Sequence, residues 1–237
     1  MKPWNRLEKS FFVAFLLWCG AGLIFTIGHI TPDHIVSQGT VPQWLIHFIR
    51  LCLEYGDPIL ILLAFANTHL HAARQWGPAV ARRWGLVILV CSFGVETLGA
   101  CTGFPFGTYH YTDRFGPLLG VVPLTIPLAW HVVVTNAVFI VRMAAPYLSR
   151  PSEAVLAAAL CTLYDFILEP FATTVKGYWI WTAGIIPLQN YLAWFVVSGL
   201  LVWFFAPTPA TRFRRDPRPV LILGITVLIF LAGRWAV

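Results

Sequence analysis

The sequence predicts an all-α integral membrane protein, a single domain over residues 1–237 built as a bundle of about seven transmembrane helices. Three observations predict this fold class. Hydrophobic residues make up 58% of the chain and charged residues 11%, whereas a soluble globular chain carries about 25% charged residues. The apolar residues fall into runs of about 20, the length that crosses a bilayer. Basic residues gather in alternate connections between these runs.

Charge, proline and glycine interrupt the apolar runs and mark where each span ends. In chain order, the predicted spans are Phe11–Ile30, Trp44–Leu70, Trp84–Cys101, Leu119–Met143, Glu153–Phe171, Ile186–Ala206 and Val220–Trp235. The runs are too long for barrel strands and do not alternate apolar with polar residues. We find no internal repeat and no low-complexity linker, so one bundle is expected.

The first span follows three basic residues, Lys2, Arg6 and Lys9, in the manner of a signal peptide. Its apolar run is long and no A-x-A cleavage pattern follows it, which favours an uncleaved signal anchor. The later spans begin after arginine pairs or prolines, or after the glycine-rich and proline-rich segment 102–117.

The positions of Lys and Arg orient the bundle independently of hydropathy. One set of connections holds twelve of them: Lys2, Arg6, Lys9, Arg74, Arg82, Arg83, Arg142, Arg150, Arg212, Arg214, Arg215 and Arg218. The other set holds Arg114, Lys176 and Arg234, and Arg50 lies near the start of the second span. This alternation needs an odd number of spans and predicts a cytoplasmic N-terminus and an outside C-terminus. A bacterial or archaeal cytoplasmic membrane is the expected location.

Composition also excludes several classes of protein. The shortage of charge excludes a soluble enzyme, a disordered regulator and a secreted disulfide scaffold. The net charge of +6 belongs to short connections, so membrane topology explains it better than a nucleic-acid partner. Five cysteines lie in or beside apolar runs without a C-x-x-C pair and are expected to be packing residues: Cys19, Cys52, Cys91, Cys101 and Cys161.

Five acidic residues within the predicted spans are the strongest functional signal: Glu54, Asp57, Glu96, Asp165 and Glu169. An ionisable group in hydrocarbon costs several kcal/mol and usually pairs or does chemistry. The predicted topology places all five at one depth, with too few cations there to neutralise them. We therefore expect some to be protonated and favour function for Glu96 and Asp165. Pairing with Arg50, Lys176 or tyrosine hydroxyls remains equally open for Glu54, Asp57 and Glu169, and Pro170 is expected to place Glu169 at a water-accessible helix end.

Aromatic residues accompany these acids. The segment Thr102–Gly116 is rich in glycine, proline and aromatics, which suits a lid over the outer end of the bundle. Four tryptophans lie near the same side: Trp179, Trp181, Trp194 and Trp203. An interfacial belt is the ordinary explanation, and a wall that stabilises a carbocation is the alternative.

Histidines and known motifs add little. His69 and His71 point to different faces of their helix, and His131 is expected to be a hydrogen-bonded core residue. The sequence has no Walker loop, G-x-G-x-x-G motif or zinc signature, so we expect no nucleotide, no metal and no other cofactor. A retinal protein would need a buried lysine in its seventh span, and Lys2, Lys9 and Lys176 all lie elsewhere.

Two blocks of the chain, 96–130 and 165–194, carry a family resemblance. The matching residues are Glu96, Gly99, Thr102, Gly103, Pro105, Gly107, Tyr109, Tyr111, Pro123, Pro127 and Trp130, then Asp165, Pro170, Gly177, Tyr178, Trp179, Trp181, Pro187, Asn190 and Trp194. Together these blocks resemble the membrane-integral carotenoid biosynthesis hydratases, the family of the bisanhydrobacterioruberin and monocyclic-carotenoid hydratases. Two departures, Thr182–Ile186 in place of an aromatic-rich stretch and Ala193 in place of glycine, bear on the substrate more than on the fold.

The resemblance implies protonation of the terminal C=C of a lipid-dissolved carotenoid or isoprenoid and capture of the tertiary carbocation by water, with no cofactor. It implies that Glu96 or Asp165 is the acid, the other positions the water, and Glu169 belongs to the same catalytic group. Residues implied to bind substrate are Tyr109, Tyr111, Trp130, Trp179, Trp181, Asn190 and Trp194, with Glu54 and Asp57 as supporting acids. Partners are the substrate, water and the bilayer, and no oligomeric state is predicted.

Other functions remain open at this point. A proton-initiated carotenoid or terpenoid cyclase forms the same cation and quenches it with an internal double bond. A proton-coupled transporter would use the acids as a relay, although they gather at one depth and no inverted repeat accompanies them. A structural partner for other pigment enzymes would leave the acids without a purpose.

Overall fold

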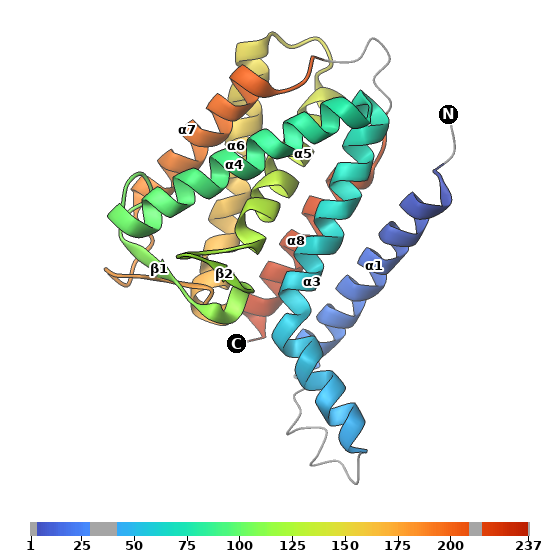
Figure 1. Ribbon diagram of the computed structural model, residues 1–237, viewed down its shortest axis with the longest axis vertical. Coiled ribbons are helices and arrows are strands. Elements are labelled where there is room, and N and C mark those ends of the chain that lie inside the picture. Colours follow the sequence, from blue (N-terminus) through green and yellow to red (C-terminus); the bar gives the residue numbers. More distant parts are fainter. Residues whose placement is uncertain (1–3, 29–41, 209–214, 237) are drawn as a thin grey trace.

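The computed structural model describes residues 4–28, 42–208 and 215–236. Three basic residues used in the topology prediction, Lys2, Arg212 and Arg214, lie outside these ranges, as do the last two residues of the predicted first span. The described residues form seven α-helices (Figure 1): α1 Arg6–Ile27, α3 Gln43–Trp76, α4 Pro78–Thr102, α5 Thr125–Ala144, α6 Arg150–Pro170, α7 Leu188–Phe205 and α8 Arg218–Trp235.

All seven predicted helical segments are helices, and six of them are long and apolar enough to cross a membrane. The helix outside that set is α3, which carries Arg50, Glu54 and Asp57. Three boundaries differ by six residues: α3 continues to Trp76, α4 begins already at Pro78, and α5 begins only at Thr125. Residues 118–123 form a tight hairpin there, in which Gly120 adopts a left-handed φ of 64°.

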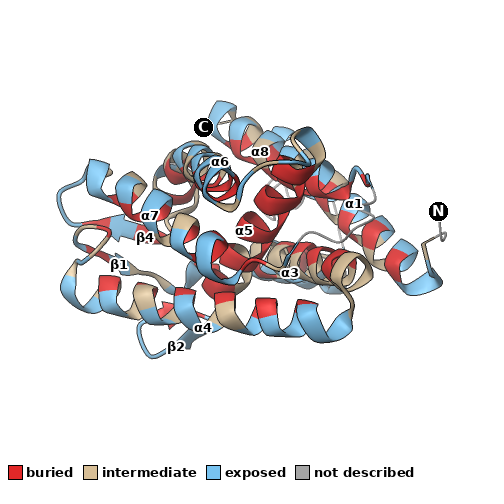
Figure 2. Ribbon diagram, turned by 90° about the horizontal axis from the view of Figure 1, so that it is seen from above, coloured by how far each residue is buried: buried red, intermediate tan, exposed pale blue. Residues whose placement is uncertain are grey.

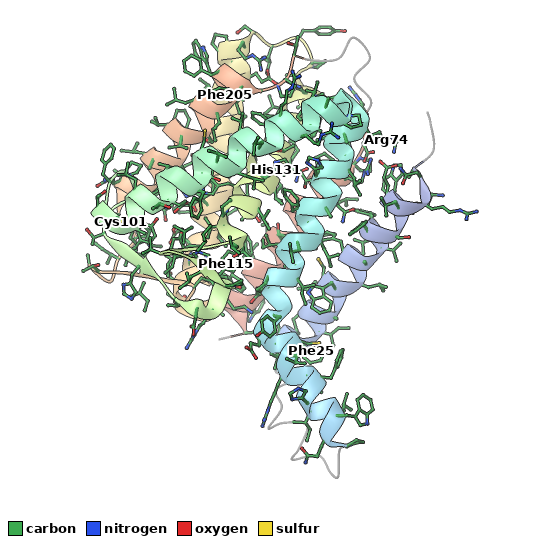
Figure 3. The ribbon with its side chains drawn as sticks, viewed as in Figure 1. Phe25, Arg74, Cys101, Phe115, His131 and Phe205 are labelled. Carbon is green, nitrogen blue, oxygen red and sulfur yellow. The ribbon has the colours of Figure 1, made fainter. Side chains whose placement is uncertain are left out.

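The helices form a bundle around α5, which lies in the middle of the view from above (Figure 2). In the most apolar stretch of each helix, 78% of the residues of α5 are buried but only 17% of those of α1. The two ends of the chain lie at opposite ends of the bundle (Figure 1). We call them the arginine end, where Arg74 lies in Figure 3, and the strand end, which carries the β-strands.

Short strands cover the strand end. β1 (Tyr109–Tyr111) pairs antiparallel with β4 (Trp179–Trp181), and β2 (Leu118–Leu119) pairs with β3 (Val122–Pro123). The 3₁₀ turn η1 (Asp113–Phe115) joins β1 to β2. The segment after α4 thus folds over the end of the bundle, and a second segment from 70 residues further along the chain pairs with it.

The helical backbone does not stop where α6 ends at Pro170. It continues as a π-helical turn, η2 (Phe171–Lys176), and stops at Gly177, which adopts a left-handed φ of 63°. That turn reverses the chain, so β4 passes back over the bundle beside β1. The path of the backbone after α6 therefore determines which groups surround Glu169, the last acid of this helix.

A group of charged residues, the arginine cluster, holds α1, α3 and α8 together at the arginine end: Glu8, His71, Arg74, Asp216 and Arg218. Arg218 is fully buried, donates from Nη2 to Asp216 at 2.8 Å and lies 3.4 Å from Glu8. Glu8 also lies 3.6 Å from Arg74. Burial would raise the pKa of Asp216, but hydrogen bonds with His71 and Arg218 outweigh it and hold this pKa below its ordinary value. Charges in this cluster are therefore matched.

Candidate active site

A cavity of about 830 Å³, including its open part, lies at the strand end between the helices. Its size is typical of small-molecule sites. Apolar and aromatic side chains form most of its surface, and four carboxyl groups, Asp57, Glu96, Asp165 and Glu169, also line it. All seven residues expected to bind substrate line the same cavity: Tyr109, Tyr111, Trp130, Trp179, Trp181, Asn190 and Trp194.

Glu96, in the last two turns of α4, accepts three hydrogen bonds from neutral groups. Tyr109 and Tyr111 donate from their hydroxyls to Oε2 at 2.7 and 2.6 Å, and Trp130 Nε1 donates to Oε1 at 2.7 Å. Burial and the neighbouring Glu96 raise the pKa of both tyrosines well above the ordinary value, so both hydroxyls keep their protons. We call these four residues the Glu96 wall.

Glu169 is surrounded in a similar way by the second strand. Trp181 and Trp179 donate from Nε1 to its Oε2 at 3.0 and 3.3 Å, and Asn190 Nδ2 lies 3.3 Å from Oε1. Glu169 is only 1% exposed. The expectation of a water-accessible helix end is therefore wrong, because η2 extends α6 and β4 folds back over the carboxyl group.

Asp165 lies one helical turn before Glu169 and is also 1% exposed. It accepts one hydrogen bond within the described part of the chain, from Asn190 Nδ2 to Oδ2 at 2.7 Å. One amide nitrogen of Asn190 thus contacts both Asp165 and Glu169. We call Asp165, Glu169, Trp179, Trp181 and Asn190 the Asp165 wall.

The remaining two predicted acids lie differently. Asp57 lines the cavity and pairs with Lys176 at 2.8 Å, as the structural alternative anticipated. Glu54 is exposed on α3 and does not line the cavity. Among the described residues, no cation pairs with Glu96, Asp165 or Glu169, and no group of three or more His, Cys, Asp or Glu is placed to hold a metal ion.

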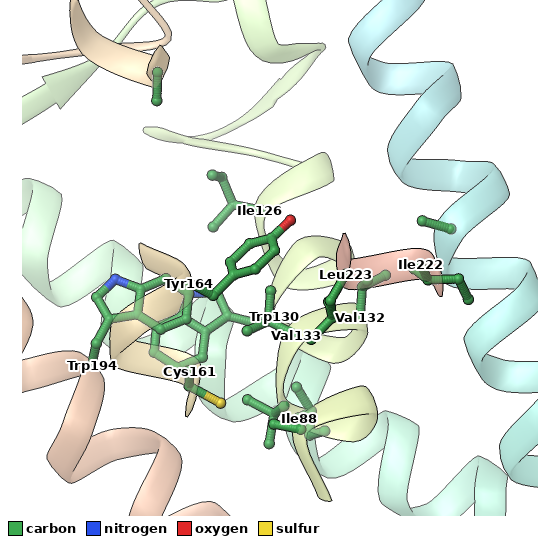
Figure 4. Packing of buried hydrophobic residues seen from close by; sticks show 14 of the residues in the cluster. Ile88, Ile126, Trp130, Val132, Val133, Cys161, Tyr164, Trp194, Ile222 and Leu223 are labelled. Carbon is green, nitrogen blue, oxygen red and sulfur yellow. The ribbon is translucent and has the colours of Figure 1, made fainter. Parts of the chain in front are cut away.

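Stacked indoles form part of the cavity surface (Figure 4). Trp130 and Trp194 lie with ring centroids 3.7 Å apart and ring planes within 2°. Tyr164 lines the same cavity and donates its hydroxyl to Thr226 at 2.9 Å. Electron-rich ring faces stabilise a nearby positive charge, so this surface suits a cationic intermediate.

Sequence reasoning missed several residues of this cavity: Phe106, Phe115, Tyr164, Phe171, Tyr178 and Phe230. An aromatic side chain in an apolar run gives no signal of the side it faces. Two glycines of the first sequence block, Gly99 and Gly107, are explained by their close contacts. A Cβ at Gly99 would lie 2.6 Å from the Phe106 ring, and Gly107 has a φ of 109° where a Cβ would lie 2.6 Å from Pro187.

The two walls are built alike, a correspondence that was not evident from the sequence. In each, a helix carrying the acid is followed by a strand and then by a helix that returns from the strand end. The matching segments are Gly107–Tyr109–Tyr111 with Gly177–Trp179–Trp181 and Leu128–Ala129–Trp130 with Leu192–Ala193–Trp194. Strands β1 and β4 pair with each other, and the two matching tryptophans stack.

The fold and the site define a helical membrane protein with a cavity that combines buried carboxyl groups and aromatic rings. The chain belongs to a family described as carotenoid biosynthesis protein, whose sequence signature matches residues 56–236. The match covers both walls of the cavity and leaves α1 outside. The resemblance of the two sequence blocks to this family is thus confirmed.

One curated relative is the bisanhydrobacterioruberin hydratase of Haloarcula japonica, 33% identical over 158 residues. That alignment covers 63% of this chain and 54% of the relative. The chain therefore spans about half the length of the curated relative it matches. No solved structure shows a significant match to the chain.

Proposed function

We propose that the protein is a carotenoid hydratase of the membrane, which adds water to the terminal C=C of a lipid-dissolved carotenoid. One observation carries the proposal: three buried carboxyl groups line an aromatic cavity, and the donors that reach them from the described residues are all neutral. Membership of a carotenoid biosynthesis family and similarity to a hydratase support the substrate class and the reaction.

Asp165 is the proton donor in this proposal. Glu96 and Glu169 each accept three hydrogen bonds, an arrangement that stabilises a carboxylate, whereas Asp165 accepts one, on Oδ2. A proton on Oδ1 of Asp165 leaves that hydrogen bond intact. Glu96 and Glu169 lie nearby, and like charges in a dry site repel each other. Their presence therefore also favours the neutral, protonated form of Asp165.

Transfer of this proton to the less substituted carbon of the terminal double bond leaves a tertiary carbocation. The stacked Trp130 and Trp194 and the ring of Tyr164 provide π-faces beside it. Water then forms the new C–O bond and releases a proton to a carboxylate, which gives a tertiary alcohol. Net addition of water transfers no electrons, so this reaction calls for no redox cofactor.

The strand end faces outside and the arginine end faces the cytoplasm in this proposal, because Lys and Arg are concentrated in the connections of the arginine end. The substrate is a carotenoid dissolved in a bacterial or archaeal cytoplasmic membrane. Its reacting end enters the cavity, where polar groups hold the water that a hydration needs.

The test is conversion of an acyclic carotenoid by the purified protein in oxygen-18 water. We expect a product with one labelled hydroxyl and no new ring, formed by the wild-type protein and not by Asp165→Asn. A ring-containing product without label would replace the hydratase by a cyclase. Proton-coupled uptake into proteoliposomes without any chemical product would favour a transporter.

A further inference from the structure

The two walls differ in the chemistry of the groups that surround their carboxylates. On the Glu96 wall, two hydroxyl groups reach the same carboxylate oxygen, from Tyr109 and Tyr111. Around Glu169, the donors are two indoles, Trp179 and Trp181, and the amide of Asn190. Since the walls are otherwise built alike, this difference points to different tasks.

A tyrosine hydroxyl can donate one hydrogen bond and accept another at the same time, whereas an indole N–H and an amide NH₂ only donate. A water that attacks a carbocation must lose a proton as its C–O bond forms, so it needs an acceptor beside it. Tyr109 and Tyr111 already donate to Glu96, and each hydroxyl oxygen has two lone pairs with which it can accept from a water. The indoles of the other wall cannot pass a proton on in this way, so on that wall the only acceptors are the carboxyl groups and the Asn190 carbonyl.

The positions of the groups agree with this division. Glu96 lies on α4 and Asp165 on α6, and both line the cavity. Tyr109 stands opposite Trp181 in the β1–β4 pair, and Tyr111 stands opposite Trp179. Each strand therefore serves its own carboxylate, and the hydroxyl-bearing strand belongs to the wall that lacks the proposed proton donor.

We infer that the attacking water is held by the Tyr109 and Tyr111 hydroxyls on the Glu96 wall, while the proton comes from Asp165 on the other wall. This inference rests on the proposed hydratase function. As the water oxygen bonds to the cation, its proton passes to a tyrosine oxygen and the tyrosine's own proton passes to Glu96. Solvent water in the cavity then returns one proton from Glu96 to Asp165, so each turnover consumes one water and no net proton.

Two readouts in deuterium oxide enriched in oxygen-18 separate the two steps. Labelled alcohol measures capture by water. Deuterium in the recovered carotenoid measures formation of the cation, because a cation that loses a proton instead of gaining water regenerates a labelled alkene. The ratio of alcohol to deuterated alkene does not depend on how much of each variant folds.

For Tyr109→Phe and Tyr111→Phe combined, we expect this ratio to fall by about 100-fold, with deuterated alkene still formed. The matched control, Tyr147→Phe, removes an exposed hydroxyl between α5 and α6 that does not line the cavity and should keep the wild-type ratio. Asp165→Asn should form neither product.

Other outcomes overturn the inference. If alcohol and deuterated alkene fall together in the tyrosine variants, the hydroxyls have a structural role at the strand end and do not hold the attacking water. An unchanged ratio would place the water elsewhere. If the wild-type protein itself forms neither alcohol nor deuterated alkene, the proposed function fails and not just the position of the water.

Discussion

The two ends of the bundle bury acidic residues in opposite ways. At the arginine end, Glu8 and Asp216 lie beside Arg74 and Arg218, so the negative charges are matched by positive ones. At the strand end, Glu96, Asp165 and Glu169 contact hydroxyl, indole and amide groups and no cation within the described residues. Both groups are almost inaccessible to solvent.

The difference teaches how to tell structural acids from reactive ones. An acid paired with a buried arginine must stay ionised, because the loss of its charge would leave the arginine unpaired. An acid held by neutral donors can take up or release a proton without leaving a buried cation unpaired. The arginine end therefore fixes helices in place, and the strand end retains carboxyl groups that can exchange protons.

The largest effect is expected for Asp165→Asn, which tests whether a strand-end acid is reactive or structural. The substitution keeps size and the contact with Asn190 but removes the acid, so we expect turnover to fall by about 1000-fold or more. The amount of folded protein should stay near that of the wild type, as judged by size-exclusion chromatography in detergent. Loss of the folded protein instead would assign Asp165 to structure.

Arg218→Met should show the reverse pattern. Removing this cation leaves Asp216 and Glu8 buried without a full partner, and breaking such a pair costs about 3–5 kcal/mol. Thermal unfolding in detergent measures the loss, and turnover per folded molecule should be unchanged. A variant as stable as the wild type would show that the arginine cluster does not hold α1, α3 and α8 together.

The pH dependence of stability tests whether Asp216 at the arginine end is ionised and paired. The pKa of Asp216 is lower in the folded state than its ordinary value, so its pairing stabilises the fold above that ordinary value, about 3.9, and the stabilisation is lost as the pH falls further. The melting temperatures of wild type and Asp216→Asn should therefore differ by a constant amount from pH 7 to pH 5 and converge below pH 4. Convergence already near pH 6 would contradict this pairing.

The smallest effect is expected for the pair of Asp57 and Lys176, which lies at the edge of the cavity. The two side chains are 22% and 34% exposed, and such pairs contribute about 0.2–1 kcal/mol. Lys176→Met should change the melting temperature by no more than a few degrees and should leave the alcohol product intact. A complete loss of product would show that this pair takes part in the reaction.

The sequence predicted the helices well because each is a long apolar run between charged or turn-forming residues. It also selected the three acids, because a carboxyl group in such a run is costly unless it is used. It could not predict the donors around each acid, since Trp179, Trp181 and Asn190 reach Glu169 only after η2 has reversed the chain. The same turn explains why the expected exposure of Glu169 was wrong.

Tyr164 shows the other limit of the sequence. It precedes Asp165 in an apolar helix, and nothing in its spacing says that it lines the cavity, because that depends on Thr226 of α8 accepting its hydroxyl. The short strands were likewise hidden, because two segments of three residues pair only when the whole bundle brings them together.

The stack of Trp130 on Trp194 also gives the protein an optical signature. Two indoles with centroids 3.7 Å apart and nearly parallel planes share their electronic excitation and do not absorb as separate chromophores. We expect this coupling to contribute to the near-ultraviolet circular dichroism of the eleven tryptophans, beside a more distant indole pair, Trp76 and Trp84, at 6.4 Å. A polyene that enters beside the stack should change this contribution, which would let the protein's own tryptophans report on occupancy of the cavity.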